Sequence, residues 1–243
     1  MTARDDGVKP VIGFIGTGVM GRSMAGHLLD AGYEMNVYNR TAEKCEPLVS
    51  RGAQLLSGPG EVASRSDVVI TIIGFPKDVE DVYLAPGGVV ERAAPGSLLI
   101  DMTTSSPALA ARIYDAARAR GVGACDAPVT GGDKGAREAT LSIMVGGDAV
   151  DFNRALPFLE VMGKNIVHFG PAGSGQYAKL ANQVVIAGCM LGVCEGLAFA
   201  SQAGLDTGKL IGCIENGAAG SWSLSNYGPR ILNGDFAPGF FVK

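Results

Sequence analysis

The stretch Gly16-Thr17-Gly18-Val19-Met20-Gly21 decides the fold, because it joins a short apolar run, residues 11–15, to a helical pattern over residues 21–29. The run indicates a buried parallel strand. At such a junction Gly16 allows the tight turn, Gly18 leaves room for a pyrophosphate, and Gly21 lets helix and strand pack closely. The stretch therefore predicts a dinucleotide site whose phosphates meet free N–H groups at the helix start. An ordinary glycine-rich turn is the alternative.

The residues after the second expected strand, 35–38, bear on the choice of nicotinamide cofactor. An NAD site normally places Asp or Glu there to bind the ribose 2′-hydroxyl. This chain has Asn39-Arg40-Thr41 instead, so no carboxylate would repel a 2′-phosphate, and Arg40 can pair with it. Lys44 lies one turn further on and could add charge. The pattern favours NADP, with NAD as the second choice and a solvated surface arginine as the alternative role of Arg40.

Strand and helix patterns alternate through the following residues. The strands are rich in Val and Ile, which suits strands buried on both faces. This alternation predicts an α/β fold, a Rossmann-type doubly wound parallel sheet with helices on both faces. Further strands are expected at 67–73, 97–102, 124–129, 141–145 and 165–169, and further helices at 41–49, 106–120 and 148–162.

The pattern changes at the turn of residues 170–173. From residue 174 to 203 the chain has no proline, and apolar residues surround the whole helical circumference, so we expect a long helix buried on most sides. Short helices are expected at 206–216 and 223–232. The sequence thus predicts a dinucleotide-binding Rossmann domain, 1–170, and the first part of an all-helical substrate and oligomerisation domain, 171–243.

The composition excludes several classes of protein. The chain has 243 residues, a formal net charge of −4 and 47% hydrophobic residues, which disfavours disorder and a nucleic-acid partner. Glu195 and three glycines interrupt the most apolar stretch, 184–200, which disfavours a membrane span. Two histidines and five scattered cysteines without a C-x-x-C pair predict no metal site and a reducing compartment. The first ten residues lack an apolar signal core, so we expect a cytoplasmic protein.

A lysine at the start of the long helix is the candidate catalytic group. Lys179 is the only Lys or Arg between Lys164 and Lys209, and Asn182 and Gln183 share its helix face. Burial would lower the pKa of such a lysine toward the range useful for acid–base work. A lysine that extends to water from near a helix end is an equally good interpretation of the pattern.

Two loops after expected strands are candidate ligand sites. Thr130, Gly131 and Gly132 lie in a loop of small residues whose N–H groups could bind a carboxylate, to which Thr130 adds a hydroxyl. The second loop, Asp101-Met-Thr-Thr104-Ser-Ser-Pro107, follows a strand at the edge where open α/β sheets bind ligands. A plain turn and simple helix capping are the respective alternatives.

Four stretches carry a resemblance to a known family. They are F-I-G-T-G-V-M-G-R-S-M-A-G-H-L from Phe14, D-M-T-T-S-S-P from Asp101, D-A-P-V-T-G-G from Asp126, and G-x-G-x-x-x-K-x-x-N-Q from Gly173. In order and spacing they resemble the β-hydroxyacid dehydrogenases, which include 3-hydroxyisobutyrate dehydrogenases, tartronate semialdehyde reductases and glyoxylate/succinic semialdehyde reductases. The stretch N-R-T-x-x-K-C from Asn39 is similar to the NADPH-preferring glyoxylate reductase branch.

The resemblance implies a role for each candidate residue. Lys179 would be the catalytic acid–base, Asn182 or Gln183 would orient the substrate, and Thr104 would contact the cofactor. The substrate carboxylate would be held by Thr130, Gly131 and Gly132. The implied reaction is hydride transfer between NADP(H) and a small acid bearing an aldehyde, keto or hydroxyl group. A homo-oligomer, a dimer or tetramer formed through the helical domain, is also expected.

The chain departs from the family pattern at three places. Thr130 stands where the family usually has Ser, and residues 74–76, Gly-Phe-Pro, replace the usual Leu-Pro. In the family a helical segment with a further cofactor-binding lysine follows the point where this chain stops, at residues 238–243, so the chain resembles a truncated member. Two alternatives are a non-catalytic NADP(H)-binding module for assembly and an imine reductase-like enzyme, which usually lacks a lysine here.

Overall fold

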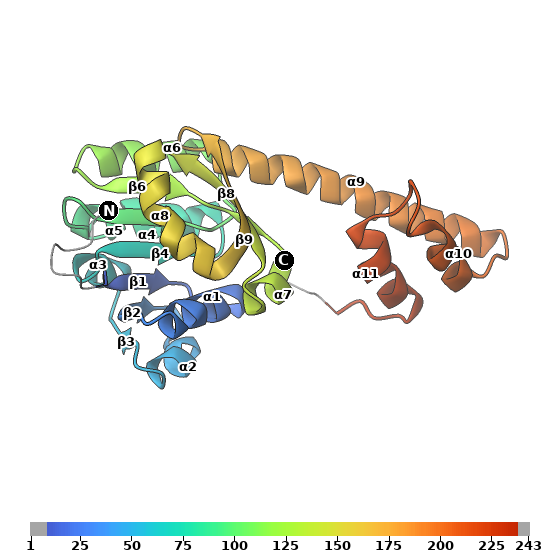
Figure 1. Ribbon diagram of the computed structural model, residues 1–243, viewed down its shortest axis with the longest axis horizontal. Coiled ribbons are helices and arrows are strands. Elements are labelled where there is room, and N and C mark those ends of the chain that lie inside the picture. Colours follow the sequence, from blue (N-terminus) through green and yellow to red (C-terminus); the bar gives the residue numbers. More distant parts are fainter. Residues whose placement is uncertain (1–8, 238–243) are drawn as a thin grey trace. The chain divides into compact units, whose positions relative to one another are not determined.

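The structure is a computed structural model that describes residues 9–237 (Figure 1). Contacts within the chain divide it into two compact units, Met1–Lys179 and Leu180–Lys243. The expectation attached to residues 238–243 lies outside the described residues.

The first unit is built on one sheet whose strands follow the order β3-β2-β1-β4-β5-β6-β8-β7, with β9 paired to β8. The pairs from β3 to β6 are all parallel. The carboxyl ends of β1, β2, β4, β5 and β6 therefore meet at one edge of the sheet, the edge where such folds bind ligands. The strands are β1 Ile12–Ile15, β2 Met35–Tyr38, β3 Gln54–Leu55, β4 Val68–Thr71, β5 Leu98–Asp101, β6 Gly123–Asp126, β7 Val129–Thr130, β8 Leu141–Gly147 and β9 Gly163–Gly170.

Helices cover both faces of this sheet, as Figure 1 shows. Phe14 belongs to the core on one face, with Met24 of α1 and Leu159 of α8. Ile15, the next residue, belongs to the core on the other face, because successive side chains of a strand point to opposite sides. The helices are α1 Val19–Asp30, α2 Glu46–Val49, α3 Pro59–Ser64, α4 Pro76–Leu84, α5 Val89–Arg92, α6 Pro107–Arg118, α7 Gly132–Arg137 and α8 Ala149–Met162, with a 3₁₀ turn at Ala42–Cys45.

The doubly wound architecture predicted from the sequence is confirmed, but the sheet is not parallel throughout. β8 runs antiparallel to both β6 and β7. The single strand expected over 124–129 is two short strands, because Pro128 between them has no N–H group to donate to a ladder. The chain bends there, and β7 pairs with β8 as a short antiparallel ladder.

The second unit consists of the rest of α9, which spans Ser174–Gln202, with α10 Thr207–Ile214 and α11 Trp222–Leu232. Its small core joins Val193 and Leu197 of α9 to Ile211 and Leu224. The prediction that the long helix is buried on most sides is wrong: in its most apolar window only 11% is buried. Among the described residues, only two short helices of the second unit are there to cover it.

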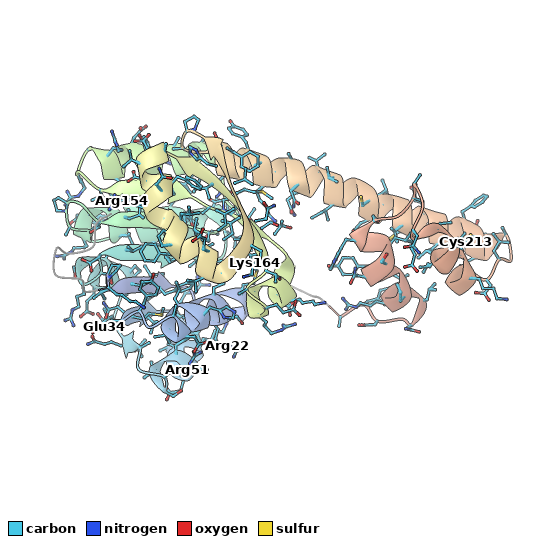
Figure 2. All side chains as sticks on the ribbon, in the orientation of Figure 1. Arg22, Glu34, Arg51, Arg154, Lys164 and Cys213 are labelled. Carbon is cyan, nitrogen blue, oxygen red and sulfur yellow. The ribbon has the colours of Figure 1, made fainter. Side chains whose placement is uncertain are left out.

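The length and composition of α9 would be enough to cross a membrane. A single helix with these properties also occurs in proteins that do not enter membranes, so this finding assigns α9 to no membrane. Within the described residues no group of three or more His, Cys, Asp or Glu side chains could hold a metal ion. All five cysteines are unpaired, and Cys213 on α10 is labelled in Figure 2.

Candidate active site

The glycine turn between β1 and α1 has the geometry that a phosphate cradle needs. A Cβ on Gly16, whose φ is 99°, would collide with the carbonyl oxygen of Ile72. A Cβ on Gly21 would collide with the carbonyl oxygen of Gly16, so both positions require glycine for packing. A Cβ on Gly18 would meet nothing within 4 Å. The space in front of Gly18 is therefore open.

The start of α1 is free to bind an anion. Gly18 is the N-cap residue, no side chain caps the helix, and its first turn carries no acidic residue. The N–H groups of Val19, Met20 and Gly21 have no intrahelical acceptor at this end, so they are available to phosphate oxygens. The residues of the turn thus fit the pyrophosphate of a dinucleotide.

Thr17 and Asn39 fix the shape of this turn. The Thr17 side chain is buried, with Oγ1 3.4 Å from Sγ of Cys45. The Thr17 N–H donates to Oδ1 of Asn39 at 3.0 Å, and Nδ2 of Asn39 donates to the Thr41 carbonyl at 2.9 Å. The Thr17 N–H is thus occupied within the protein. The Asn39 side chain ties the glycine turn to the loop that carries Arg40.

Arg40 lies at the surface, with 87% of its side chain exposed. Its guanidinium is 3.3 Å from Oδ1 of Asp78, whose other oxygen accepts from the N–H of Phe75 at the start of α4. Asp78 is a partner that the sequence did not reveal, because it lies 38 residues from Arg40. An exposed pair of this kind is weak, so a phosphate can compete for the guanidinium.

Lys179 is buried, with 8% of its surface exposed, which favours a lysine that stays within the protein over one that extends to water. No hydrogen bond or ion pair holds its amine within the part of the chain that the structure describes. Burial disfavours the charged form and lowers the pKa of Lys179 below its ordinary value. The amine is therefore closer to exchanging a proton at neutral pH than a surface lysine would be.

Two buried side chains fasten the start of α9 to the edge of the sheet. Asp126, at the end of β6, accepts from the N–H groups of Gly173 and Gln176 at 2.7 and 2.8 Å. The Gln176 side chain accepts from the Ser105 N–H at 2.8 Å and donates to the Thr103 carbonyl at 2.7 Å. Burial raises the pKa of Asp126, against the effect of these N–H donors. Neither side chain is among the site residues that the sequence predicts.

The end of β5 carries a second buried carboxyl group. Asp101 accepts from Oγ1 of Thr71 at 2.7 Å and from the N–H of Thr103 at 3.1 Å. Tyr83 lies 2.8 Å from the same Thr71 oxygen, so its hydroxyl donates to Thr71. Burial raises the pKa of Asp101 to about 6, although the bonds from Thr103 and Thr71 oppose the shift. This network holds the loop that leads to Thr104.

The remaining candidates occupy three places. Thr130 ends β7 and is half-buried, and Gly131 and Gly132 follow with φ values of 127° and 63°, which favour glycine. Thr104 is exposed between the buried residues Thr103 and Ser105. Asn182 and Gln183 belong to the second unit, where Nδ2 of Asn182 donates to Oε1 of Gln183 at 3.0 Å.

Two models of known protein families together match nearly all of the chain. The model for the NAD binding domain of 6-phosphogluconate dehydrogenase matches residues 11–170. The model for the NAD-binding region of NADP-dependent 3-hydroxyisobutyrate dehydrogenase matches residues 173–243.

Three individual proteins are similar to the chain over most of its length. A probable mitochondrial 3-hydroxyisobutyrate dehydrogenase-like protein of Arabidopsis thaliana is 51% identical over 96% of this chain and 70% of its own. An NAD-dependent L-serine dehydrogenase of Pseudomonas aeruginosa is 40% identical over 90% of this chain and 73% of its own. The solved structure of Mycobacterium tuberculosis 3-hydroxyisobutyrate dehydrogenase with L-serine is 33% identical, with a TM-score of 0.87, over 96% of this chain and 81% of that one.

Proposed function

We propose a substrate class and a cofactor for this chain on the premise that it belongs to the 3-hydroxyisobutyrate dehydrogenase-like family of β-hydroxyacid dehydrogenases. It is an NAD(P)-dependent oxidoreductase that acts on a CH–OH group. The substrate we propose is a small β-hydroxyacid, or a 2-hydroxyacid, with its aldehyde or keto acid as the product of oxidation. Oxidation of a 3-hydroxyisobutyrate-type acid and reduction of glyoxylate or succinic semialdehyde are the candidate reactions.

The burial of Lys179 is the observation that carries this proposal. A nicotinamide dinucleotide held at the glycine turn would supply the hydride acceptor for oxidation and the hydride donor for reduction. During oxidation neutral Lys179 takes the proton of the substrate hydroxyl, and during reduction its ammonium form returns that proton to the developing alkoxide. Burial lowers the pKa of Lys179, which favours the neutral form that oxidation requires.

The loop after β7 is the proposed carboxylate site. Thr130 supplies a hydroxyl donor, and Gly131 and Gly132 bring the backbone close to a ligand because they have no side chains. Asn182 or Gln183 orients the substrate. The L-serine named with the mycobacterial structure is a β-hydroxyacid of the size that this class requires, which supports the substrate proposal.

We propose NADP as the preferred cofactor. Arg40 follows β2 at the position where an acidic residue would bind the 2′-hydroxyl of NAD, and its ion pair with Asp78 is exposed. The NAD-dependent relative shows that family members also use NAD, so both cofactors belong in the test. An Arg40→Ala variant should bind NADPH about tenfold more weakly and NADH unchanged. Equal losses for both cofactors would contradict a 2′-phosphate contact, and Arg65→Ala is the matched surface control.

The experiment that tests the function is a panel of short carbonyl and hydroxy acids with each cofactor. Glyoxylate, succinic semialdehyde, 3-hydroxyisobutyrate and L-serine are assayed by the absorbance of the reduced nicotinamide. Turnover of at least one acid, faster with NADP(H), is the expected result. Tight NADPH binding without turnover of any acid would favour a non-catalytic binding module instead.

Two further proposals concern the setting of the enzyme. Large apolar side chains on α9 are exposed, among them Val184, Leu191 and Phe199, which supports assembly of a homo-oligomer through the helical domain. The five unpaired cysteines support a reducing compartment, for which we propose the cytoplasm.

A further inference from the structure

We infer that Gln176 is a positioning residue, whose side chain fixes the helix turn that carries Lys179 against the loop Thr103–Ser105 at the cofactor edge of the sheet. The inference rests on the proposed function, because it concerns how the amine of Lys179 is aimed. Gln176 itself lies too deep to touch a ligand, since none of its surface is exposed.

Both ends of the Gln176 amide are used on the same loop. Oε1 accepts from the Ser105 N–H and Nε2 donates to the Thr103 carbonyl, at 2.8 and 2.7 Å. A carbonyl and an N–H two residues apart are the pair that a neighbouring strand would bind, so the amide replaces a strand at this point. Thr104, between them, is left exposed. The Gln176 amide therefore sets how Thr104 is presented to a cofactor.

Lys179 follows Gln176 by three residues on α9, so the two side chains lie on the same helix face about 4.5 Å apart along the axis. Asp126 holds the backbone of the first turn through the N–H groups of Gly173 and Gln176. Within the described part of the chain, Gln176 supplies the side-chain bonds between α9 and the Thr103–Ser105 loop. A change at Gln176 would let the Lys179 amine and this loop move independently.

The amide group of Gln176 matters as much as its position, because it both accepts and donates a hydrogen bond. Glutamate would keep the acceptor for Ser105 but, when ionised, would lose the donor to Thr103. Methionine would keep the shape and lose both bonds. Protonated glutamate regains a donor, and burial raises the pKa of a carboxyl group, so Gln176→Glu becomes more like the natural protein as the pH falls. These two variants separate the hydrogen bonds from the volume of the side chain.

The test compares Gln176→Met with Asn36→Leu as a matched control. Asn36 on β2 is also a buried amide with two bonds, from Nδ2 to the Arg65 carbonyl and to Oγ of Ser66, at 3.0 and 3.1 Å. Both variants lose stability, read as Tm. Gln176→Met should also lower kcat about 10- to 100-fold, because a small misplacement of a catalytic group costs that much, while Asn36→Leu keeps kcat.

A second readout uses the free protein and needs no turnover. Mass spectrometry measures how much acetic anhydride modifies Lys179 over a range of pH. This dependence gives the midpoint pH at which the amine of Lys179 loses its proton. That midpoint should move up in Gln176→Met, because a released amine reaches water, and stay in place in Asn36→Leu. In Gln176→Glu the activity relative to the natural protein should rise as the pH falls from about 8 to about 6.

An unchanged midpoint together with kcat within about threefold of the natural protein in Gln176→Met would overturn the inference, as would an equal loss of kcat in Asn36→Leu. Failure of the proposed function has a different signature: the natural protein turns over no acid, or Lys179→Ala keeps its activity. In that case the midpoint measurement still decides whether Gln176 holds Lys179 in place.

Discussion

Lys179 is buried as a residue, and within the described residues no carboxylate pairs with its amine. Burial lowers the pKa of Lys179 below its ordinary value, which favours a role in proton transfer. Because general acid–base catalysis typically contributes 10²–10⁴-fold, Lys179→Ala should lose at least about a hundredfold in kcat while keeping its affinity for NADPH.

The control for this prediction is Lys164→Ala, which removes an exposed lysine of β9 in the same unit. Lys164→Ala should leave both kcat and the dissociation constant of NADPH unchanged. Near-normal turnover in Lys179→Ala, measured with the best acid of the panel, would remove this lysine from the mechanism.

The carboxyl group of Asp101 makes the stability of the fold depend on pH. Its pKa is about 6 in the folded protein and near 4 in the unfolded chain, so the folded state binds the proton more tightly. The resulting stabilisation is fully present below about pH 4 and is lost as the pH rises through about 6, to a total of about 3 kcal/mol. In Asp101→Asn this part of the pH dependence should disappear.

Urea unfolding between about pH 4 and pH 7 measures this difference. Asn can still accept the bonds from Thr71 and Thr103, so the variant keeps the contacts of Asp101 and loses only its ionisation. The difference in the free energy of unfolding between variant and natural protein should grow toward neutral pH, in favour of the variant. A difference that stays constant across this range would contradict the raised pKa of Asp101.

At the scale of the element, the three glycines of the turn that leads into α1 have different roles. Gly16 and Gly21 are required by neighbouring backbone, whereas Gly18 faces open space in a conformation that alanine also adopts. Gly18→Ala should therefore keep its Tm and bind both NADPH and NADH more weakly, because the new methyl group occupies the space of the pyrophosphate.

Gly58 offers a matched control for Gly18. It is the N-cap of α3, its backbone is extended, and a Cβ there would meet nothing within 4 Å. Gly58→Ala should leave the dissociation constants of both cofactors unchanged, as measured by fluorescence titration. If Gly18→Ala binds the cofactors as tightly as Gly58→Ala does, the phosphates do not lie at the start of α1.

How well the sequence predicts each helix or strand depends on its length and on the residues that bound it. The strand over 35–38 is observed with the same bounds that the sequence predicts. The sequence does not predict the helices α3, α4, α5 and α7, because they have only four to nine residues and their periodicity is too short to recognise. The strand expected over 124–129 was divided by Pro128.

The sequence predicts the site residues that stand out individually, but not those whose role depends on partners far away in the chain. Lys179 was found because it is the one cation in a long apolar stretch. Gln176 was not assigned a role, because its partners Thr103 and Ser105 lie more than 70 residues away and only the fold brings them together. A polar residue three positions before a buried lysine is the signal that could have found it.

At the scale of the whole molecule, the second unit buries little of its own apolar surface. Among the described residues its core cluster joins Val193, Leu197, Ile211 and Leu224, while Val184, Val185, Leu191, Phe199 and Trp222 are exposed. Exposed apolar surface of this kind marks an interface or an aggregation hazard. We expect the protein to form a dimer or tetramer in dilute solution.

Sedimentation of the natural protein and of a Leu191→Asp/Phe199→Asp double variant tests this expectation. The charges should shift the double variant toward the monomer, because burying an unpaired charge in an interface is costly. Val150→Asp is the control, since Val150 is an exposed apolar residue of α8 in the first unit. A natural protein that sediments as a monomer at micromolar concentration would contradict the expected assembly.

The division of the chain at Lys179/Leu180 has an evolutionary consequence. The glycine turn, Arg40, Thr130 and Lys179 all fall in the first unit, while Asn182, Gln183 and the exposed apolar residues fall in the second. On the proposed roles, mutations in the second unit would alter substrate orientation and assembly, whereas the residues proposed for the cofactor, the carboxylate and the proton are inherited with the first. Descendants of one ancestral gene could diversify their metabolism in this way while sharing a single electron-transfer chemistry.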